Sequence, residues 1–439
     1  MNRAYSALVV AAVLTLSGCP FQVNYSIGGT VTGLIGSGLV LQDNGGSDLT
    51  VTANGTFTFR DRVANTDAFT VTIATQPSNP VQTCTVRNGS GTIEKASITN
   101  VIVSCTQAGR FAYVTNQMSN TVSAYVIDST SGLLTPAAGS PFSSIGTTPV
   151  ALQVDPNGTY LYVADNSSNT LSSYSIDSVS GALTPLNFSV VTGTSPVAIA
   201  MHPAGTFLYV ANFGSNSVSG YSVGTGGSLT ALANFPLQVG VAPSALKVDA
   251  NGNFLYIANS GSASISVFSI DPASGAITSI AGSPFSSGNS PVSFAIAATG
   301  AYAYVANATD DSIGEYSINA TTGALIAVSG SPLATTTEPL SLAADPLGRF
   351  IYATNVTAAN EVASYSITPA SGVLAPVSDV AAGTFPVSIA ADPSGSFVYV
   401  ANQNSNNVTV YSVSAGGTLA LVPNSSIAAG SQPTAIAVD

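Results

Sequence analysis

Charged side chains are scarce in this sequence of 439 residues, of which only 6% are Asp, Glu, Lys or Arg. Eight Lys and Arg residues stand against twenty Asp and Glu, so the formal net charge is −12. So few basic residues cannot neutralise a phosphate backbone, which excludes nucleic acid as a partner. One histidine and three cysteines exclude a zinc site built from several His or Cys ligands. With 45% hydrophobic residues, the composition is not that of a disordered chain.

The first residues predict export from the cytoplasm. Arg3 precedes an apolar run over residues 4–16, which is too short to span a bilayer and typical of a secretory signal. The run ends in Leu16-Ser17-Gly18-Cys19, which resembles the bacterial lipobox, in which the cysteine becomes the lipidated first residue. We therefore expect a signal peptide over 1–18, lipidation of Cys19 and a linker over 19–24. An ordinary cleaved signal ending in cysteine is the alternative.

A lipid anchor would place the chain on the periplasmic or cell-surface side of a bacterial envelope. In that compartment the remaining pair, Cys84 and Cys105, is expected to form a disulfide, two free thiols being the alternative. Residues 25–107 show the period-two alternation of half-buried strands, for example over 56–59 and 69–73, separated by Asn-Gly turns. The segment predicts a small β-sandwich that resembles immunoglobulin-like or carboxypeptidase-regulatory-like modules and acts as a spacer or docking domain.

Residues 108–439 contain an internal repeat. Two series share one period of 47 to 49 residues: tyrosines at Tyr113, Tyr162, Tyr209, Tyr256, Tyr304, Tyr352 and Tyr399, and prolines at Pro149, Pro196, Pro243, Pro291, Pro339, Pro386 and Pro433. Each unit holds four strand-like pieces, which is typical of a β-propeller blade. The fold class is therefore all-β, a seven-bladed β-propeller preceded by a small β-sandwich.

The two ends of the repeat region are halves of one unit. The last unit stops at Asp439, just after its first strand, whereas the first unit begins at its second strand. We expect the strand over 434–438 to pair with that over 111–115 and close the ring, which removes exposed sheet edges. Along the innermost strands large residues alternate with small ones, which favours large-on-small packing between blades.

The motif Tyr113-Val114-Thr115-Asn116, repeated as Tyr209-Val210-Ala211-Asn212, resembles the YVTN-repeat and lactonase-family seven-bladed propellers. That family includes 6-phosphogluconolactonase, and the resemblance implies Pro-Arg-His at the pocket mouth of an active enzyme. Here the two residues after each proline include neither Arg nor His: Val150-Ala151, Val197-Ala198, Ser244-Ala245, Val292-Ser293, Leu340-Ser341, Val387-Ser388 and Thr434-Ala435. The resemblance therefore implies the fold, without the catalytic residues.

Polar positions of the propeller divide into structural and candidate binding residues. His202 stands where five other units have Asp, so we interpret it as a turn residue rather than a base. An Asn or Asp ends the second strand of every unit: Asn116, Asp165, Asn212, Asn259, Asn307, Asn355 and Asn402. We expect each of these side chains to form hydrogen bonds with the backbone of the next loop. The alternative is a ring of carboxamides that binds polar ligands.

The fourth residue after the proline of each inner strand is small in the other units, but it is Lys247 in one unit and Gln153 in another. Their long side chains are therefore predicted to reach the central channel. Lys247 would hold an anionic ligand or pair with a carboxylate. Asp310, Asp311 and Glu338 are placed in loops at the expected mouth and complete the predicted ligand-binding set. Their spacing matches no calcium loop, so we predict no metal, no cofactor and no catalytic residue.

The sequence thus favours a non-catalytic lipoprotein whose propeller binds a protein or glycan partner at the cell envelope, most simply as a monomer. The first alternative is a lactonase-family hydrolase of the 6-phosphogluconolactonase type, acting on a lactone. The second is a structural envelope protein without a ligand.

Overall fold

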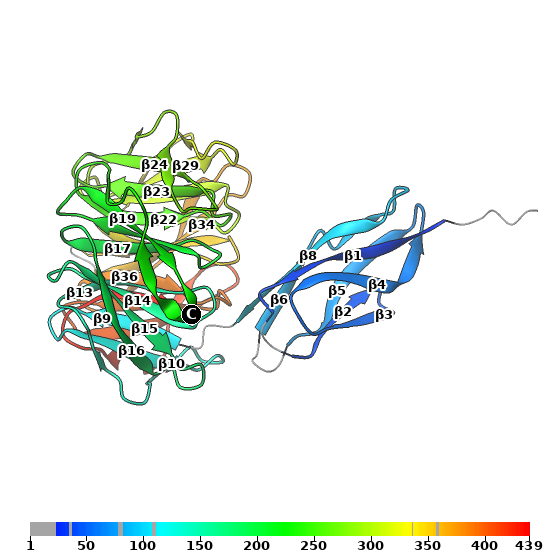
Figure 1. Cartoon of the computed structure of the whole chain (residues 1–439), viewed down its shortest axis with the longest axis horizontal. Helices are drawn as coiled ribbons and strands as arrows, with labels where there is room; N and C mark the ends of the chain where they lie inside the picture. Colours follow the sequence, from blue (N-terminus) through cyan, green and yellow to red (C-terminus); the bar gives the residue numbers. More distant parts are fainter. Residues whose placement is uncertain (1–22, 35–36, 78–81, 108–110, 336, 357–359) are drawn as a thin grey trace, which may run out of the picture. The chain divides into compact units, whose positions relative to one another are not determined.

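The structure is a computed structural model that describes residues 23–34, 37–77, 82–107, 111–335, 337–356 and 360–439. The predicted signal peptide and Cys19 lie outside these residues. The chain divides into two compact units, Met1–Thr106 and Gln107–Asp439, whose strands are labelled in Figure 1. Within the described residues, no helix has the length and apolar character that crossing a membrane requires.

Two four-stranded sheets form the N-terminal unit, in the orders β4-β1-β8-β6 and β3-β2-β5-β7. Phe57 and Phe59 face its core while Thr56 and Thr58, which alternate with them, are exposed, as the alternation predicts. Cys84 of β6 is bonded to Cys105 of β8, which confirms the predicted disulfide. The strands are β1 (Asn24–Thr32), β2 (Leu39–Asp43), β3 (Ser47–Val51), β4 (Gly55–Ala64), β5 (Ala68–Thr75), β6 (Gln82–Arg87), β7 (Ser90–Thr92) and β8 (Ile98–Gln107).

Seven antiparallel sheets form the C-terminal unit, and each is one blade of a propeller. The innermost strands of blades 1 to 7 are β41 (Pro433–Val438), β13 (Pro149–Val154), β17 (Pro196–Met201), β22 (Pro243–Val248), β27 (Pro291–Ile296), β32 (Pro339–Ala344) and β36 (Pro386–Ala391). The second strands are β9 (Phe111–Asn116), β14 (Tyr160–Asp165), β18 (Phe207–Asn212), β23 (Phe254–Asn259), β28 (Tyr302–Asn307), β33 (Phe350–Asn355) and β37 (Phe397–Asn402).

The third strands are β10 (Thr121–Ile127), β15 (Thr170–Ile176), β19 (Ser217–Val223), β24 (Ser264–Ile270), β29 (Ser312–Ile318), β34 (Glu361–Ile367) and β38 (Asn407–Val413). The outermost strand is continuous in blades 2 and 6, as β16 (Leu183–Val191) and β35 (Leu374–Ala381). In the other blades it is broken into two short pieces: β11 (Leu134–Pro136) and β12 (Phe142–Ser143), β20 (Leu229–Ala231) and β21 (Leu237–Gln238), β25 (Ile277–Ser279) and β26 (Phe285–Ser286), β30 (Leu325–Ala327) and β31 (Leu333–Ala334), β39 (Leu419–Leu421) and β40 (Ile427–Ala428). One 3-10 turn, η1 (Thr225–Gly227), precedes β20.

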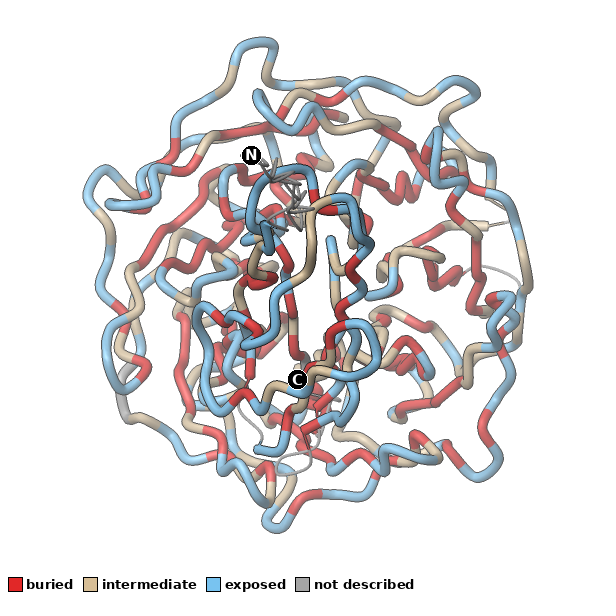
Figure 2. The backbone as a smooth tube through the Cα atoms, turned by 90° about the vertical axis from the view of Figure 1, so that its right-hand side faces the viewer, coloured by how far each residue is buried: buried red, intermediate tan, exposed pale blue. Residues whose placement is uncertain are grey.

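The last strand closes the ring, as the repeat pattern predicts. β41 pairs antiparallel with β9, in the sheet order β11-β10-β9-β41. The Asp439 carboxylate accepts a hydrogen bond from the Phe111 amide at 2.7 Å. The Gln117 carboxamide donates to that of Gln432 at 2.9 Å. In Figure 2 buried residues concentrate in the strands of the blades, and exposed residues follow the loops around the rim.

Inner strands pack large side chains of one blade on small ones of its neighbour. Leu152 and Val154 of β13 face the preceding blade, where they share a core cluster with Ala435 and Ala437 of β41. The same arrangement places Leu246 and Val248 of β22 against Ala198 and Ala200 of β17. The third and fifth residues after each proline therefore face the preceding blade, and the second and fourth face the following blade.

The recurring tyrosines join neighbouring blades. In five blades the buried tyrosine of the second strand donates a hydrogen bond to a glycine carbonyl in the following blade: Tyr113 to Gly181, Tyr162 to Gly227, Tyr209 to Gly275, Tyr256 to Gly323 and Tyr304 to Gly372. These phenols are buried, and each such bond contributes roughly 0.5–1.5 kcal/mol. In these five blades the tyrosine therefore joins neighbouring blades, whereas the hydroxyls of Tyr352 and Tyr399 have no hydrogen-bond partner among the described residues.

Candidate functional site in the central channel

The central channel has two chemically different ends, because each inner strand pairs antiparallel with the second strand of its blade. At one end, which we call the mouth, each inner strand begins at its proline beside the turn after the second strand. At the other, which we call the turn end, the inner strand turns into the second strand. At the mouth, Asn166 Nδ2 donates to the Pro196 carbonyl at 3.1 Å, and Thr434 Oγ1 donates to the Pro149 carbonyl at 3.2 Å. These mouth side chains therefore link blade 2 to blade 3 and blade 1 to blade 2.

The Asn and Asp series at the ends of the second strands is buried, and every member is 0% exposed. Asn116 Nδ2 donates to Thr121 and Ser123 of the third strand, and its Oδ1 accepts from the Gly430 amide at 3.0 Å. In five other blades the side-chain Oδ1 has no hydrogen-bond partner among the described residues: Asn212, Asn259, Asn307, Asn355 and Asn402. A Cβ added at Gly430 would lie 2.6 Å from Asn116 Cγ, so glycine is needed for this close approach. The predicted loop-bonding role is confirmed at Asn116, and the burial excludes a ligand-binding carboxamide ring.

Asp165 is the one acid in this buried series. Burial raises the pKa of its carboxyl, and hydrogen bonds from Ser172, Ser144 and the Gly146 amide oppose that shift. A raised folded-state pKa means that the stability of the fold falls as the pH rises from the unfolded-state pKa to the folded-state pKa, and that the full penalty is present above the latter. The penalty is absent below the unfolded-state value, where both states are protonated.

Asp165→Asn is therefore expected to stabilise the propeller at neutral pH, since the other six blades hold Asn in this place. We expect a rise in melting temperature of roughly 2 °C at pH 7, the shift that ~1 kcal/mol produces in a large domain. The gain should shrink as the pH falls through the folded-state pKa of Asp165. Melting curves at several pH values measure it, and an equal gain at acid and neutral pH would contradict the assignment.

The three predicted acidic ligands lie in the loops of blades 5 and 6, and the first two have structural roles there. Asp310 accepts hydrogen bonds from the Asn289 amide at 2.7 Å and side chain at 2.8 Å, which lower its pKa. In blade 2 Ser168 occupies the equivalent place, and its hydroxyl accepts a hydrogen bond from the Thr147 amide at 3.1 Å. Asp311 occupies the left-handed turn position, with φ of 46°. Glu338 bonds Val356 through its backbone carbonyl.

Asp310 and Asp311 therefore take part in the turn structure, and their use as a ligand-binding set with Glu338 stays a prediction. Within the part of the chain that the structure describes, no three His, Cys, Asp or Glu residues gather as a metal site would need.

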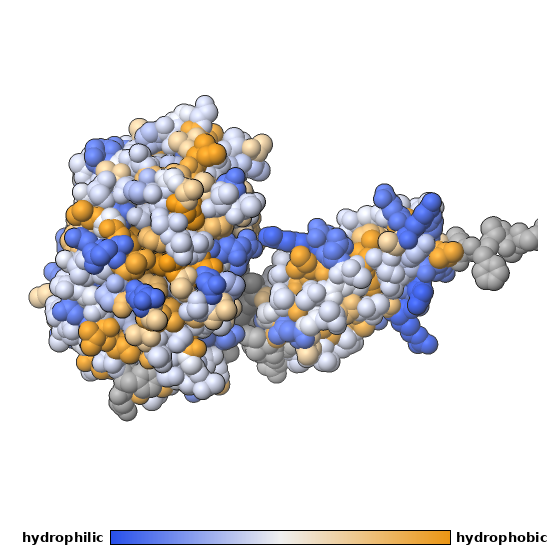
Figure 3. Space-filling model, turned by 45° about the horizontal axis from the view of Figure 1, so that its top comes forward, coloured by the Kyte–Doolittle hydropathy of each residue, from blue (hydrophilic) through white to orange (hydrophobic). Residues whose placement is uncertain are grey.

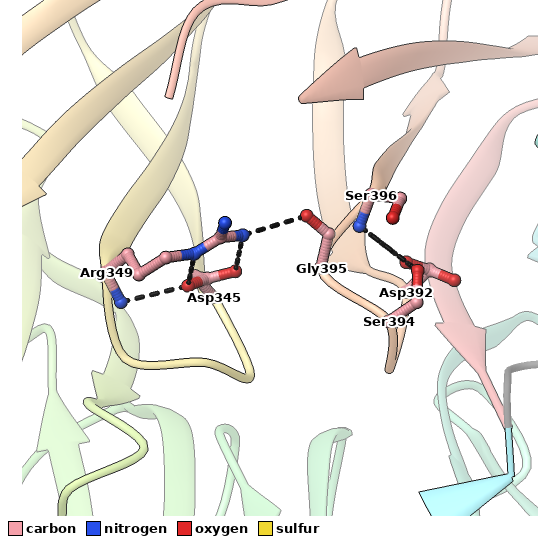
Figure 4. Close-up of polar contacts among 6 residues, drawn as sticks. All are labelled: Asp345, Arg349, Asp392, Ser394, Gly395 and Ser396. Carbon is pink, nitrogen blue, oxygen red and sulfur yellow. Dashed lines mark hydrogen bonds and ion pairs between the residues drawn. The ribbon is translucent and has the colours of Figure 1, made fainter. Parts of the chain in front are cut away.

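The turn end holds His202 and Arg349. His202 Nδ1 accepts a hydrogen bond from the Ala204 amide at 3.1 Å, which confirms it as a turn residue. Arg349 forms a two-bonded ion pair with Asp345 at 2.9 and 3.0 Å, and it also donates to the Gly395 carbonyl of the next blade at 3.0 Å (Figure 4). The guanidinium is therefore committed to joining blades 6 and 7, away from the mouth.

Lys247 reaches the channel, as predicted. Both faces of β22 are packed: Leu246 and Val248 against blade 3, and Ala245 against blade 5. Lys247 lies on the same face of β22 as Ala245, two residues before it, because side chains alternate between the faces of a strand. Its exposure on an innermost strand places its side chain where that face meets the channel. The Lys247 side chain is exposed, yet inner strands surround it, and this partial desolvation lowers the pKa of its ammonium.

No ion pair or hydrogen bond of the Lys247 side chain is formed among residues 23–34, 37–77, 82–107, 111–335, 337–356 and 360–439. Gln153 stands at the same level of the channel in blade 2, where its Nε2 donates to the neighbouring Val154 carbonyl at 2.8 Å. The equivalent residue of the other five blades is alanine: Ala200, Ala295, Ala343, Ala390 and Ala437. Lys247 is therefore the strongest electrostatic feature of the described channel wall.

Serine hydroxyls cap backbone amides along one side of the channel only. The amides of Leu342, Ile389 and Ile436 donate to Ser293, Ser341 and Ser388 of the preceding blades at 2.9, 3.3 and 3.1 Å. In blades 1 to 4 the capping position is alanine (Ala435, Ala151, Ala198 and Ala245), so it offers no hydroxyl to the equivalent amides of blades 2 to 5, those of Leu152, Ile199, Leu246 and Phe294. The channel therefore has a capped wall, blades 6, 7 and 1, and an uncapped wall, blades 2 to 5.

The uncapped wall was not recognised in the sequence. The Ala or Ser two residues after each proline is visible there, but nothing in one strand shows that its side chain meets an amide of the next blade. Chemically, this wall offers hydrogen-bond donors and one amine. It can bind an acceptor-rich or anionic group, and a neutral amine in it can take a proton from water.

Comparisons with known proteins agree on the propeller. A family model described as "Lactonase, 7-bladed beta-propeller" matches residues 79–199, 137–243, 199–341 and 332–438. The chain is similar to a solved putative 6-phosphogluconolactonase from Bacteroides uniformis, with a TM-score of 0.68, 18% identity, and coverage of 76% of this chain and 100% of that one. It is also similar to a periplasmic gluconolactonase from Pseudomonas aeruginosa, with a TM-score of 0.65, 22% identity, and coverage of 75% and 98%. No curated protein sequence gives a significant match.

Proposed function

Because the chain belongs to the lactonase family of seven-bladed β-propellers, we propose that its propeller hydrolyses a lactone that carries no phosphate or other anionic group. Family membership supports the reaction class. The choice of a neutral substrate rests on the scarcity of cations. Of the cationic residues described in the propeller, Arg349 is paired at the turn end and Lys247 alone faces the channel. A phosphorylated sugar is normally held by several cationic donors.

Lys247 is the residue that we assign to the chemistry. Desolvation lowers the pKa of its ammonium and so raises the fraction of neutral amine at a given pH. The neutral Nζ takes a proton from water as the water oxygen attacks the lactone carbonyl carbon. The ring C–O bond then breaks, and the leaving alkoxide takes the proton from Nζ. Uncapped amides beside it donate to the carbonyl oxygen as negative charge develops there.

Hydrolysis of glucono-δ-lactone by the full chain tests this function. Lys247→Met is expected to lower kcat/KM about 100-fold, the lower end of what a general base contributes. Lys247→Arg keeps the positive charge but cannot act as a base near neutral pH, so it should lose a similar factor. The matched control is Gln153→Ala, which changes the same level of the channel and should cost much less.

Hydrolysis no faster than the uncatalysed reaction would contradict the proposed function. So would full activity in Lys247→Met. Wild-type activity on the 6-phosphorylated lactone well above that on the neutral lactone would contradict the substrate class. Melting curves of each variant show whether a lost activity reflects lost folding.

A non-catalytic binding module is the second candidate. The charge-poor composition, with 6% charged residues, suits neutral recognition of a protein or glycan. Figure 3 shows mostly pale colours on the propeller, as expected of a surface rich in Ser and Thr. We also propose that the protein is held at the cell envelope through Cys19. If no lactone is hydrolysed, capture of a partner from envelope extract would favour this candidate over a purely structural protein.

A further inference from the structure

We propose that the channel wall between blades 4 and 5 is a binding site for a single carboxylate group, held by Lys247 and the Phe294 backbone amide. The site rests on the geometry of the channel and does not require hydrolysis. A chain that turns over no lactone would still bind a small hydroxy acid here.

The first step of the argument is the direction of the Lys247 side chain. The second and fourth residues of each inner strand face the following blade, so Ala245 and Lys247 both face blade 5. Residues two apart on a strand lie about 7 Å from each other, which is within the reach of a lysine side chain. Lys247 can therefore place its ammonium beside the part of blade 5 that Ala245 faces.

The second step is the amide that this part of blade 5 presents. In blade 6 the Leu342 amide donates to Ser293 of blade 5 at 2.9 Å, so this amide points at the second residue of the preceding inner strand. The register of β27 with β28 is the same as that of β32 with β33. The Phe294 amide therefore points at Ala245, whose methyl group cannot accept a hydrogen bond.

The third step is the absence of a competing acid among the described residues. The Lys247 ammonium has no carboxylate within ion-pair distance there. Asp249, two residues after Lys247, lies at the turn end. Its carboxylate accepts hydrogen bonds from the Phe254 amide at 2.7 Å and the Asn251 amide at 3.3 Å. An amide that meets only a methyl group and an ammonium without an ion pair can both donate hydrogen bonds to a ligand. One carboxylate, with two acceptor oxygens, satisfies both.

The test uses sodium gluconate as the carboxylate and uncharged glucitol as its neutral counterpart. Lys95 and Lys247 are the two lysines of the sequence, so lysine-labelled full chain gives two lysine side-chain signals by NMR. Gluconate is expected to shift the Lys247 signal but not the signal of Lys95, which belongs to the N-terminal unit. Glucitol is expected to shift neither signal. Absence of a gluconate-dependent shift at Lys247 would overturn the site.

Variants separate the two donors. Lys247→Met should weaken gluconate binding by about 10-fold or more, as expected for loss of a charge-assisted hydrogen bond. Ala245→Ser should weaken it several-fold, because the new hydroxyl caps the Phe294 amide as Ser293 caps that of Leu342. The matched control is Ala435→Ser, which makes the same change beside Leu152 and should have little effect.

Two outcomes would contradict the site: equal affinity of wild type and Lys247→Met, or equal weakening by Ala245→Ser and Ala435→Ser. Because gluconate cannot be hydrolysed further, its binding is read without turnover. A protein that binds gluconate but hydrolyses no lactone would contradict the proposed function and would still support this site.

Discussion

A chain that ends at Gln432 is expected to lose the cooperative thermal unfolding of its propeller. The cut removes β41, whose Ile436 is 7% exposed, together with the ladder to β9 and the Asp439 bond to Phe111. A buried Ile contributes about 1.5–3 kcal/mol and each ladder bond roughly 0.5–1.5 kcal/mol. The sum is of order 5–10 kcal/mol, comparable to the whole stability of a typical domain.

Near-ultraviolet circular dichroism measures this loss through the tyrosines, since the chain has no tryptophan. Ile436→Ala gives a graded step and should cost about 2–4 kcal/mol. Leu421→Ser is the matched control, because Leu421 lies in β39 and is 52% exposed; it should change stability by less than about 0.5 kcal/mol. An unchanged propeller transition after truncation would show that the ring does not depend on its last strand.

Removing the disulfide is expected to destabilise the N-terminal unit by about 3 kcal/mol, the chain-entropy value for a loop of this size. Cys84 and Cys105 are 21 residues apart and join β6 to β8 in one sheet. In a domain of this size ~3 kcal/mol corresponds to a fall in melting temperature of roughly 10–25 °C. The measurement compares oxidised wild type with Cys84→Ser/Cys105→Ser.

The propeller transition serves as the internal control, since Cys84 and Cys105 lie in the other compact unit. The N-terminal unit of reduced wild type should have the same melting temperature as that of the double variant. A double variant that melts with oxidised wild type would mean that the bond forms without stabilising the sandwich.

The ring of blades was predictable because its signals repeat. Seven tyrosines and seven prolines at one period predict seven blades, and the missing first strand predicts closure by residues 434–438; β41 and β9 confirm both. The N-terminal strands followed from alternation such as that around Phe57 and Phe59. Each of these signals is local, or recurs often enough to stand out from chance.

The candidate site was only partly predictable, because it depends on contacts between blades. Lys247 stood out as a long polar residue among alanines, and it does reach the channel. Asp310 stood out equally as a loop acid, yet it bonds Asn289 within its own blade. Whether a polar residue serves a turn or a ligand depends on which backbone amides it meets, and a single sequence does not show that.

The pairing of β9 with β41 also constrains when this protein can finish folding. The Phe111 amide and the Asp439 carboxylate are 328 positions apart, so the first blade stays incomplete until the whole chain has been made. At ~5–20 residues per second, synthesis takes roughly 15–65 s to cover that distance. During that interval the free edge of β9 is open to wrong partners, so a chaperone or a delay in folding until synthesis is complete would protect the nascent chain.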